Sequence, residues 1–286
     1  MSPSRDRLYH DVEVLTSIRP PRNYANLASL NRAADYITGE FRKLDCRVTV
    51  QPFKVESREY KNIIASFGPE NAERVIVGAH YDVCGDQPGA DDNASAVAGL
   101  LETARLLNAG KPDLPYRVDF VAYSLEEPPY FATNRMGSAV HAKSLREGKV
   151  PVKGMICFEM IGYFSDAPGS QEFPDPAMAK IYPTRGNFIL VVGKNGQEAF
   201  SGKIKAHMKA HSKIDVQSIN FNSTGGLGGL SDHRNYWQYD YPAVMINDTS
   251  FLRNPNYHRA SDTIDTLDFD KMTEVVRGVY AALIRL

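Results

Sequence analysis

The sequence predicts an α/β fold, a three-layer αβα sandwich in which helices cover a mixed, largely parallel central sheet. Three observations predict it. Five short runs rich in β-branched and aromatic residues are typical of buried strands. Helical patterns lie between these runs, and strands that alternate with helices favour a mostly parallel sheet. No repeat and no linker rich in proline, glycine or serine interrupts residues 1–286, so we expect a single domain.

The predicted strands and helices follow from local patterns. The strands cover residues 74–83, 117–124, 155–161, 188–192 and 243–247. The clearest helix covers residues 94–108, where Val97, Leu101 and Ala104 fall on overlapping apolar faces and Asp92 and Asn93 are good capping residues. The other helices are expected at residues 31–44, 137–146, 196–213 and 269–286.

Composition excludes several classes of partner. The chain has 33 Lys plus Arg and 34 Asp plus Glu, a formal net charge of −1. It therefore lacks the basic field that holds nucleic acid phosphates or anionic lipid. Hydrophobic residues make up 43% of the chain, which favours a globular protein over a disordered one. The cysteines Cys46, Cys84 and Cys157 are too few and too far apart for a disulfide framework.

The N-terminal segment predicts no targeting signal. Residues 1–16 lack the apolar run of a signal peptide, and no apolar stretch approaches the roughly 20 residues that span a bilayer. We therefore expect a soluble protein that binds no membrane. It would be cytoplasmic as the chain is given, or periplasmic or secreted if an export signal had been removed. The oligomeric state stays open.

Acidic and histidine side chains stand where predicted strands end. They are His80 and Asp82 on the first strand, Glu126 and Glu127 after the second and Glu159 on the third, with Asp91 before the clearest helix and His258 in a late loop. Ligands of α/β sheets bind at the carboxyl ends of strands. Burying a carboxylate is costly unless it is paired, hydrogen-bonded or bound to a metal. Each feature alone is more often structural, but their joint occurrence in this order indicates a metal site.

The donor types favour zinc. The predicted ligands are His80, Asp91, Glu127, Glu159 and His258, which supply the nitrogen and oxygen atoms that zinc binds. Glu126 is then left as the proton acceptor for an attacking water. Asp82, two residues after His80, is placed to orient that imidazole. Cys84 could be a soft ligand, but nothing in the sequence pairs with it, and we expect a small buried side chain.

Five segments carry these motifs in a fixed order. They read HYDVCGDQPGADDNASAVAGLLETARLL, SLEEPPYFATNRMGSAVHAKSL, FEMIGYF, SDHRNYW and NYHRASDTIDTLD. Together they resemble the zinc-dependent peptidase family M28, which includes aminopeptidases, glutamate carboxypeptidase-like enzymes and relatives of glutaminyl cyclase. The resemblance runs from about Leu8 to the final predicted helix, and it implies a zinc exopeptidase-like fold.

The resemblance also implies roles for individual residues. It assigns His80 and Glu159 to one zinc ion, Glu127 and His258 to a second, and Asp91 together with a water to both. Glu126 would take a proton from that water and pass it to the leaving amine, and Asp82 would support His80. Two zinc ions per chain are expected, with one ion as the alternative. Family members also place a cis peptide bond after the bridging aspartate, here Asp91–Asp92.

Two positions depart from the family pattern. Many aminopeptidases of the family have an aspartate where this chain has Glu159, which is one methylene longer and leaves the metal count open. Some members have a tyrosine at the position of Gly228, whereas others have one immediately before the last histidine ligand, as Tyr257 is here. We expect the Tyr257 hydroxyl to donate to the developing oxyanion, with simple packing as the alternative.

The function expected from these residues is that of a metal-dependent aminopeptidase acting on peptides or small amino-acyl substrates. Three alternatives stay open. One is a glutaminyl-cyclase-like acyltransferase with one zinc. Another is a carboxypeptidase-type hydrolase, in which Arg135, Arg234 or Arg259 could bind the substrate carboxylate. The third is a catalytically silent binding module. The walls of the substrate pocket are expected from residues 128–134, 225–230 and 251–257.

Overall fold

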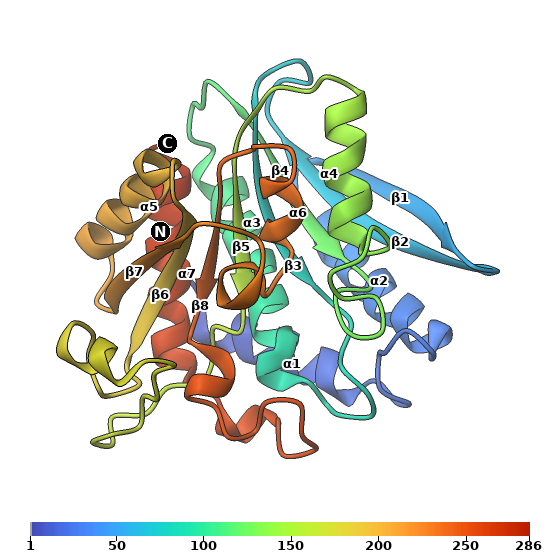
Figure 1. Cartoon of the computed structure of the whole chain (residues 1–286). Coiled ribbons are helices and arrows are strands. Elements are labelled where there is room, and N and C mark those ends of the chain that lie inside the picture. The colour runs from blue at the N-terminus through green and yellow to red at the C-terminus, as the bar shows by residue number, and fades with distance from the viewer. Residues whose placement is uncertain (1) are drawn as a thin grey trace.

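An eight-stranded sheet forms the centre of the computed structural model, which describes residues 2–286 (Figure 1). Its strands are β1 (Arg47–Val55), β2 (Arg58–Phe67), β3 (Arg74–His80), β4 (Arg117–Tyr123), β5 (Val152–Glu159), β6 (Phe188–Lys194), β7 (Asp215–Phe221) and β8 (Ala243–Asn247). Their order is β1-β2-β4-β3-β5-β8-β6-β7. The run β4-β3-β5-β8 is parallel, as is the pair β6-β7, and the remaining pairs are antiparallel. The predicted α/β class with a mixed, largely parallel sheet is therefore confirmed.

Helices cover both faces of the sheet. They are α1 (Arg5–Ser17), α2 (Leu27–Arg42), α3 (Ala96–Gly110), α4 (Gly137–Glu147), α5 (Glu198–His211), α6 (His233–Trp237) and α7 (Phe269–Leu283). Shorter helical turns span Ala90–Ser95, Pro176–Lys180, Gly226–Gly229, Ser250–Leu252 and Ile264–Thr266. Buried residues of α1, α2, α3, α5 and α7 share one apolar core, and those of α4 and α6 share another. Figure 1 shows α4 and α6 together in front of the sheet, so the three layers are confirmed.

All of the predicted strands and helices are present, but the sequence patterns miss β1, β2, β7, α1 and the short helix α6. Strands β1 and β7 lie at the two edges of the sheet and are largely half-buried or exposed, so they lack a continuous apolar run. Helix α1 buries Leu8, Val12 and Leu15 at helical spacing, and the Ser4 side chain caps it by accepting a hydrogen bond from the Arg7 amide. Within residues 2–286, no helix is long and apolar enough to cross a membrane.

The parallel strands bring their carboxyl ends to one edge of the sheet. Strand β3 lies between β4 and β5, so the residues at the ends of these strands are neighbours. His80 is the last residue of β3, Glu159 is the last of β5, and Glu126 follows shortly after Tyr123, the last residue of β4. The sheet therefore brings together side chains that are far apart in the sequence.

A buried ion-pair network joins the first three helices. The Arg105 guanidinium on α3 lies 2.6 Å from Asp11 Oδ2 on α1 and 2.8 Å from Glu40 Oε2 on α2. It also lies 3.5 Å from Glu102 Oε2 on its own helix. Asp11 is only 1% exposed, so its charge depends on Arg105 for compensation.

The Arg105→Ala variant is therefore expected to lower the free energy of unfolding by about 3 kcal/mol, because it leaves buried carboxylates without a partner. Urea denaturation followed by circular dichroism measures the change. The matched control is Arg42→Ala, which removes an exposed guanidinium from α2 and should change stability by less than about 0.5 kcal/mol. Equal losses in both variants would contradict the prediction.

Candidate metal centre

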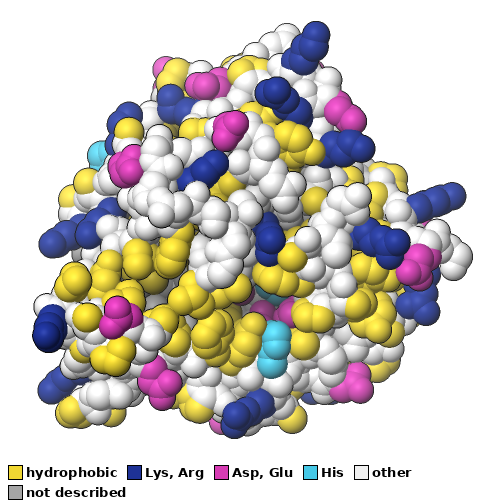
Figure 2. Space-filling view, viewed as in Figure 1, with side chains coloured by type: hydrophobic (Ala, Val, Ile, Leu, Met, Phe, Trp, Pro, Cys, Tyr) yellow, Lys and Arg dark blue, Asp and Glu magenta, His cyan; other side chains and the backbone are white. Residues whose placement is uncertain are grey.

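A cluster of acidic and histidine side chains lies at the carboxyl edge of β3, β4 and β5. Its members are His80, Asp92, Glu126, Glu127, Glu159 and His258. Figure 2 shows a histidine and acidic side chains on the floor of a hollow that is surrounded by hydrophobic side chains. The backbone is left-handed at Leu125 (φ 63°), at Met160 (φ 46°) and at His258 itself (φ 55°). Such conformations in side chains other than glycine are concentrated at functional sites.

The cluster has two halves, and Asp92 belongs to both. His80 Nε2 lies 3.5 Å from Asp92 Oδ1 and 3.3 Å from Glu159 Oε2. His258 Nε2 lies 3.1 Å from Asp92 Oδ2 and 3.4 Å from Glu127 Oε2. Each carboxylate oxygen of Asp92 thus faces a different imidazole, as expected of a carboxylate that bridges two cations. The structure brings His80, Glu127, Glu159 and His258 together, and their role as ligands stays a prediction.

Asp91 is the predicted ligand that the structure does not bring to the cluster. Its Oδ1 accepts a hydrogen bond from the Gly162 amide at 2.9 Å, and its Oδ2 accepts one from Asn254 Nδ2 at 2.7 Å. These donors hold the Asp91 carboxylate in other contacts, and the carboxylate that faces both imidazoles is that of Asp92. The cis peptide bond lies at Asp92–Asn93, so the prediction of a cis bond at Asp91–Asp92 is wrong by one residue.

Asp82 holds the turn that carries the two glutamates. Its Oδ1 accepts a hydrogen bond from the Glu126 amide at 3.2 Å, and its Oδ2 accepts one from the Glu127 amide at 3.1 Å. Asp82 Oδ1 also lies 3.5 Å from His80 Nδ1. Asp82 therefore contacts the imidazole that it is predicted to orient, and it additionally fixes the backbone of both glutamates.

Asp262 fixes the backbone of Asp91 and Asp92 in the same way that Asp82 fixes that of the two glutamates. The sequence analysis did not predict this role. Its two carboxylate oxygens accept hydrogen bonds from the Asp91 amide at 2.9 Å and from the Asp92 amide at 3.1 Å. Asp262 lies 171 positions from Asp91 in the sequence. The one signal that could have found it is its place in the segment NYHRASDTIDTLD, four residues after His258.

Arg22 is a second residue that the sequence patterns missed. Its side chain is 2% exposed, and it donates hydrogen bonds to the carbonyl oxygens of Tyr81 at 2.9 Å, Pro88 at 2.6 Å and Gly89 at 2.7 Å. It also donates to the Leu15 carbonyl of α1 at 3.2 Å. Arg22 therefore ties the segment between His80 and Asp92 to the first helix.

The cluster carries more negative than positive charge. Burial, and then the carboxylates of Glu159 and Glu127, raise the pKa of Glu126 well above its ordinary value. Burial and the adjacent Asp92 raise the pKa of Glu127 to about 8. Burial alone would lower the pKa of His258, but Asp92 and Glu127 raise it to about 10. The carboxylates of the cluster outnumber its imidazoles, so a cation would relieve their repulsion.

The donor atoms of the cluster fit divalent metal ions. Glu127 Oε1 is a buried atom without a hydrogen-bond partner in the described part of the chain, and buried His258 Nε2 has only its ion-pair contacts with Asp92 and Glu127. A buried polar atom in that state is costly unless an ion or a water satisfies it. Three donor atoms also lie within 4.8 Å of one another, one each from His80, Asp92 and Glu127. Imidazole nitrogens and carboxylate oxygens are ligands that zinc prefers.

A pocket that is partly open to solvent lies above the cluster, with a cavity volume of about 180 Å³. Its floor is formed by Asp92, Glu126, Glu127, Glu159 and His258. Its walls are largely apolar and include Pro128, Phe131, Phe173, Met178, Tyr182, Phe188, Leu190, Val192, Ile219, Phe221, Leu227, Leu230, Met245, Phe251, Leu252 and Tyr257. Residues from all three predicted wall segments line the pocket. The part of the wall formed by residues 173–182 was not predicted. Within residues 2–286, no lysine or arginine lines the pocket.

Tyr257 lies between the cluster and the pocket wall. Its ring stacks on that of His258, with ring centroids 3.8 Å apart and planes 19° apart. Burial, and then the carboxylates of Asp92 and Glu127, raise the pKa of its hydroxyl, so this group stays a protonated donor. The stacking fits both the predicted oxyanion contact and the packing alternative.

Comparison with known proteins identifies a peptidase family that the chain matches over most of its length. The model of the family described as Peptidase family M28 matches residues 62–283. YfbL of Escherichia coli (strain K12), described as uncharacterized, is 47% identical over 290 residues, which cover 98% of this chain and 88% of YfbL. A probable leucine aminopeptidase of Trichophyton verrucosum is 25% identical over 287 residues, which cover 95% of this chain and 70% of that protein.

Solved structures share the fold. The LapA aminopeptidase of Legionella pneumophila superposes with a TM-score of 0.78 at 21% identity, covering 99% of this chain and 72% of LapA. A glutaminyl cyclase of Porphyromonas gingivalis superposes with a TM-score of 0.72 at 19% identity, covering 98% of both chains. At these identities the likeness shows a common fold.

Substitution can test which of the two aspartates is a metal ligand. The Asp92→Asn variant is expected to weaken zinc binding by at least about tenfold, because one of the oxygens that faces the imidazoles is lost. Asp91→Asn should instead lower stability with much less effect on zinc, since its carboxylate accepts hydrogen bonds outside the cluster. Isothermal titration and metal analysis measure both effects. Greater zinc loss in Asp91→Asn would restore Asp91 as the ligand.

The pKa values predict how pH acts on the metal-free chain. Glu127 and His258 have folded-state pKa values of about 8 and about 10, above the roughly 4.3 and 6.5 of unfolded chains. The folded state therefore binds more protons at these two groups than the unfolded state, so stability falls as pH rises, through Glu127 from about 4 to about 8 and through His258 from about 6.5 to about 10. Thermal melts in a chelator should show this fall, and saturating zinc should remove it. A melting temperature of the chelated chain that rises over this range would contradict the assignment.

Proposed function

The chain belongs to peptidase family M28. We propose that it is a metal-dependent aminopeptidase that removes apolar N-terminal residues from peptides. The observation that carries the proposal is the acidic floor of an apolar pocket. Asp92, Glu126, Glu127 and Glu159 line that floor, where they would attract the free α-ammonium group of a peptide. A substrate held by its carboxylate would instead be repelled.

The surroundings of the pocket support this orientation of the substrate. Arg135, Arg234 and Arg259, the predicted partners for a substrate carboxylate, are not among the residues that line the pocket within the described chain. Arg234 donates a hydrogen bond to the Gly229 carbonyl at 3.0 Å, and its guanidinium lies over the Phe131 ring. Among residues 2–286, the carboxypeptidase alternative therefore has no lysine or arginine that lines the pocket.

The pocket walls support an apolar side chain at the substrate N-terminus. Phe173, Met178, Phe188, Leu190 and Met245 lie on the walls, and burying apolar surface against such groups is favourable. The similarity to probable leucine aminopeptidases agrees with this preference.

Glu126 is proposed to move the proton. It lies on the pocket floor with its Oε2 3.8 Å from His80 Nε2. Its carboxylate would take a proton from the attacking water and deliver it to the leaving amine. Tyr257 is proposed to donate a hydrogen bond to the oxyanion.

The proposed metal ligands are His80, Asp92, Glu127, Glu159 and His258. Zinc held by these residues would supply Lewis-acid catalysis, which polarises the scissile carbonyl and the attacking water. The chain positions these groups through Asp82, Asp262 and Arg22, which fix the backbone around the ligands.

The Glu126→Gln variant tests the proton transfer. Its kcat on a leucyl arylamide is expected to fall about 10²–10⁴-fold, with zinc content unchanged, because the variant keeps the shape of the side chain but cannot accept the proton. Glu147→Gln, which changes an exposed glutamate on α4, is the matched control and should retain full activity. Loss of zinc from Glu126→Gln would make Glu126 a ligand rather than the base.

The activity itself is tested with the zinc-loaded chain on a panel of aminoacyl arylamides. Release of apolar residues that a chelator abolishes is the expected result. Formation of pyroglutamate from N-terminal glutamine, with a single zinc bound, would replace the proposal by the cyclase alternative. A flat profile with metal bound would favour a silent binding module, and activity that survives removal of all metal would overturn the proposal.

A further inference from the structure

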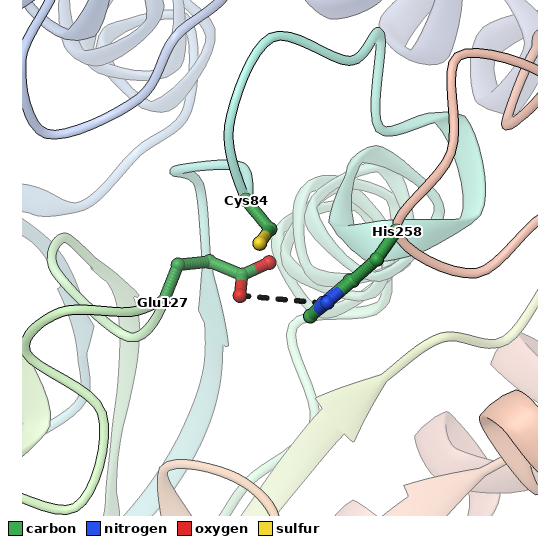
Figure 3. A group of neighbouring side chains, drawn as sticks. All are labelled: Cys84, Glu127 and His258. Atoms are coloured by element: carbon green, nitrogen blue, oxygen red, sulfur yellow. Dashed lines mark ion pairs between the residues drawn. The ribbon is translucent and has the colours of Figure 1, made fainter.

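A thiol lies beside one half of the metal centre. Cys84 stands in the turn that follows β3, and it is partly buried. Its Sγ, one carboxylate oxygen of Glu127 and one ring nitrogen of His258 all lie within 4.8 Å of one another. Figure 3 shows the Cys84 sulfur directed toward the Glu127 carboxylate, with His258 on the other side of that carboxylate. Three donors from three separate segments therefore converge.

The neighbouring carboxylate needs a further partner. Glu127 is 4% exposed, and its Oε1 has no hydrogen-bond partner among the described residues. The other oxygen, Oε2, faces His258 at 3.4 Å. A buried, unpartnered carboxylate oxygen next to a thiol and an imidazole is the environment of a cation bound by mixed oxygen, nitrogen and sulfur ligands.

The other half of the centre has no equivalent thiol within its reach in residues 2–286. The nearest candidate, Cys157, has its Sγ 3.4 Å from Ser231 Oγ. The Ser231 hydroxyl donates a hydrogen bond of 2.6 Å to Glu159 Oε2. A hydroxyl group thus stands between Cys157 and the Glu159 carboxylate. Cys84 also does not line the substrate pocket, so it approaches the centre from outside the space that a peptide would fill.

We propose that Cys84 is a further metal ligand in the half of the centre formed by Glu127 and His258. The thiol proton passes to solvent as the sulfur–metal bond forms. This half would then prefer soft ions such as zinc or cadmium, while the half formed by His80 and Glu159 has only nitrogen and oxygen donors. The inference rests on the metal binding contained in the proposed function, and it makes the two metal positions chemically unequal.

Cobalt titration of the metal-free, full-length chain tests the proposal. Co²⁺ bound to a thiolate gives a sulfur-to-metal charge-transfer absorption, and the wild-type chain is expected to show it. Cys84→Ser should lose this absorption and bind one of two cobalt equivalents at least about tenfold more weakly. Cys46→Ser, which removes another partly buried cysteine, is the matched control and should behave as wild type. Cys157→Ser should also retain the absorption.

A second measurement uses the wild-type chain alone, in case a variant does not fold. Zinc should protect Cys84, but not Cys46, from alkylation by iodoacetamide, as read by peptide mass spectrometry. Two bound cobalt ions without charge-transfer absorption, or Cys84 alkylated at the same rate with and without zinc, would overturn the inference. If the chain hydrolyses leucyl arylamide in spite of either result, the proposed function holds and only the role of Cys84 is wrong. A chain that binds no divalent metal would overturn both.

Discussion

The candidate site depends on one constraint, the pairing of a buried carboxylate with two consecutive backbone amides. Asp82 binds the amides of Glu126 and Glu127, and Asp262 binds those of Asp91 and Asp92. A buried carboxylate is stable when such donors satisfy it. These hydrogen bonds also fix the backbone of the bonded residues, and therefore the direction in which their side chains point. The distances between the side chains of the cluster therefore follow from these two contacts as much as from the sheet.

The direction of the side chains matters because the cluster concentrates negative charge at the base of an apolar pocket. Asp92 faces both imidazoles, and Glu126 remains on the pocket floor. A cation and the polar end of a substrate are both attracted to this floor, while the apolar part of the substrate meets the walls. In the proposed function, the same carboxylates would serve both metal binding and orientation of the substrate.

The sequence predicted the central strands and the ends at which the ligands lie, because buried parallel strands such as β3 form continuous apolar runs. It missed β1 and β7, whose edge positions leave one side of each strand without a partner. It also chose Asp91 over Asp92. Adjacent aspartates are equivalent in a local pattern, and they are distinguished by donors from Gly162 and Asn254, which lie 71 and 163 positions from Asp91. Contacts of this kind do not appear in the spacing of motifs.

The hydrogen bond between the Asp91 amide and the Asp262 carboxylate sets how late the cluster can form during synthesis on the ribosome. Synthesis proceeds from the N-terminus, and domains fold as their residues emerge. The contact joins positions separated by 171 residues, and His258 lies close to Asp262 in the sequence. Strands β3, β4 and β5 are therefore made long before the cluster is complete. Helix α7 belongs to the main apolar core and follows Asp262 in the sequence, so this core and the acidic edge are both completed only when nearly all of the polypeptide has been made.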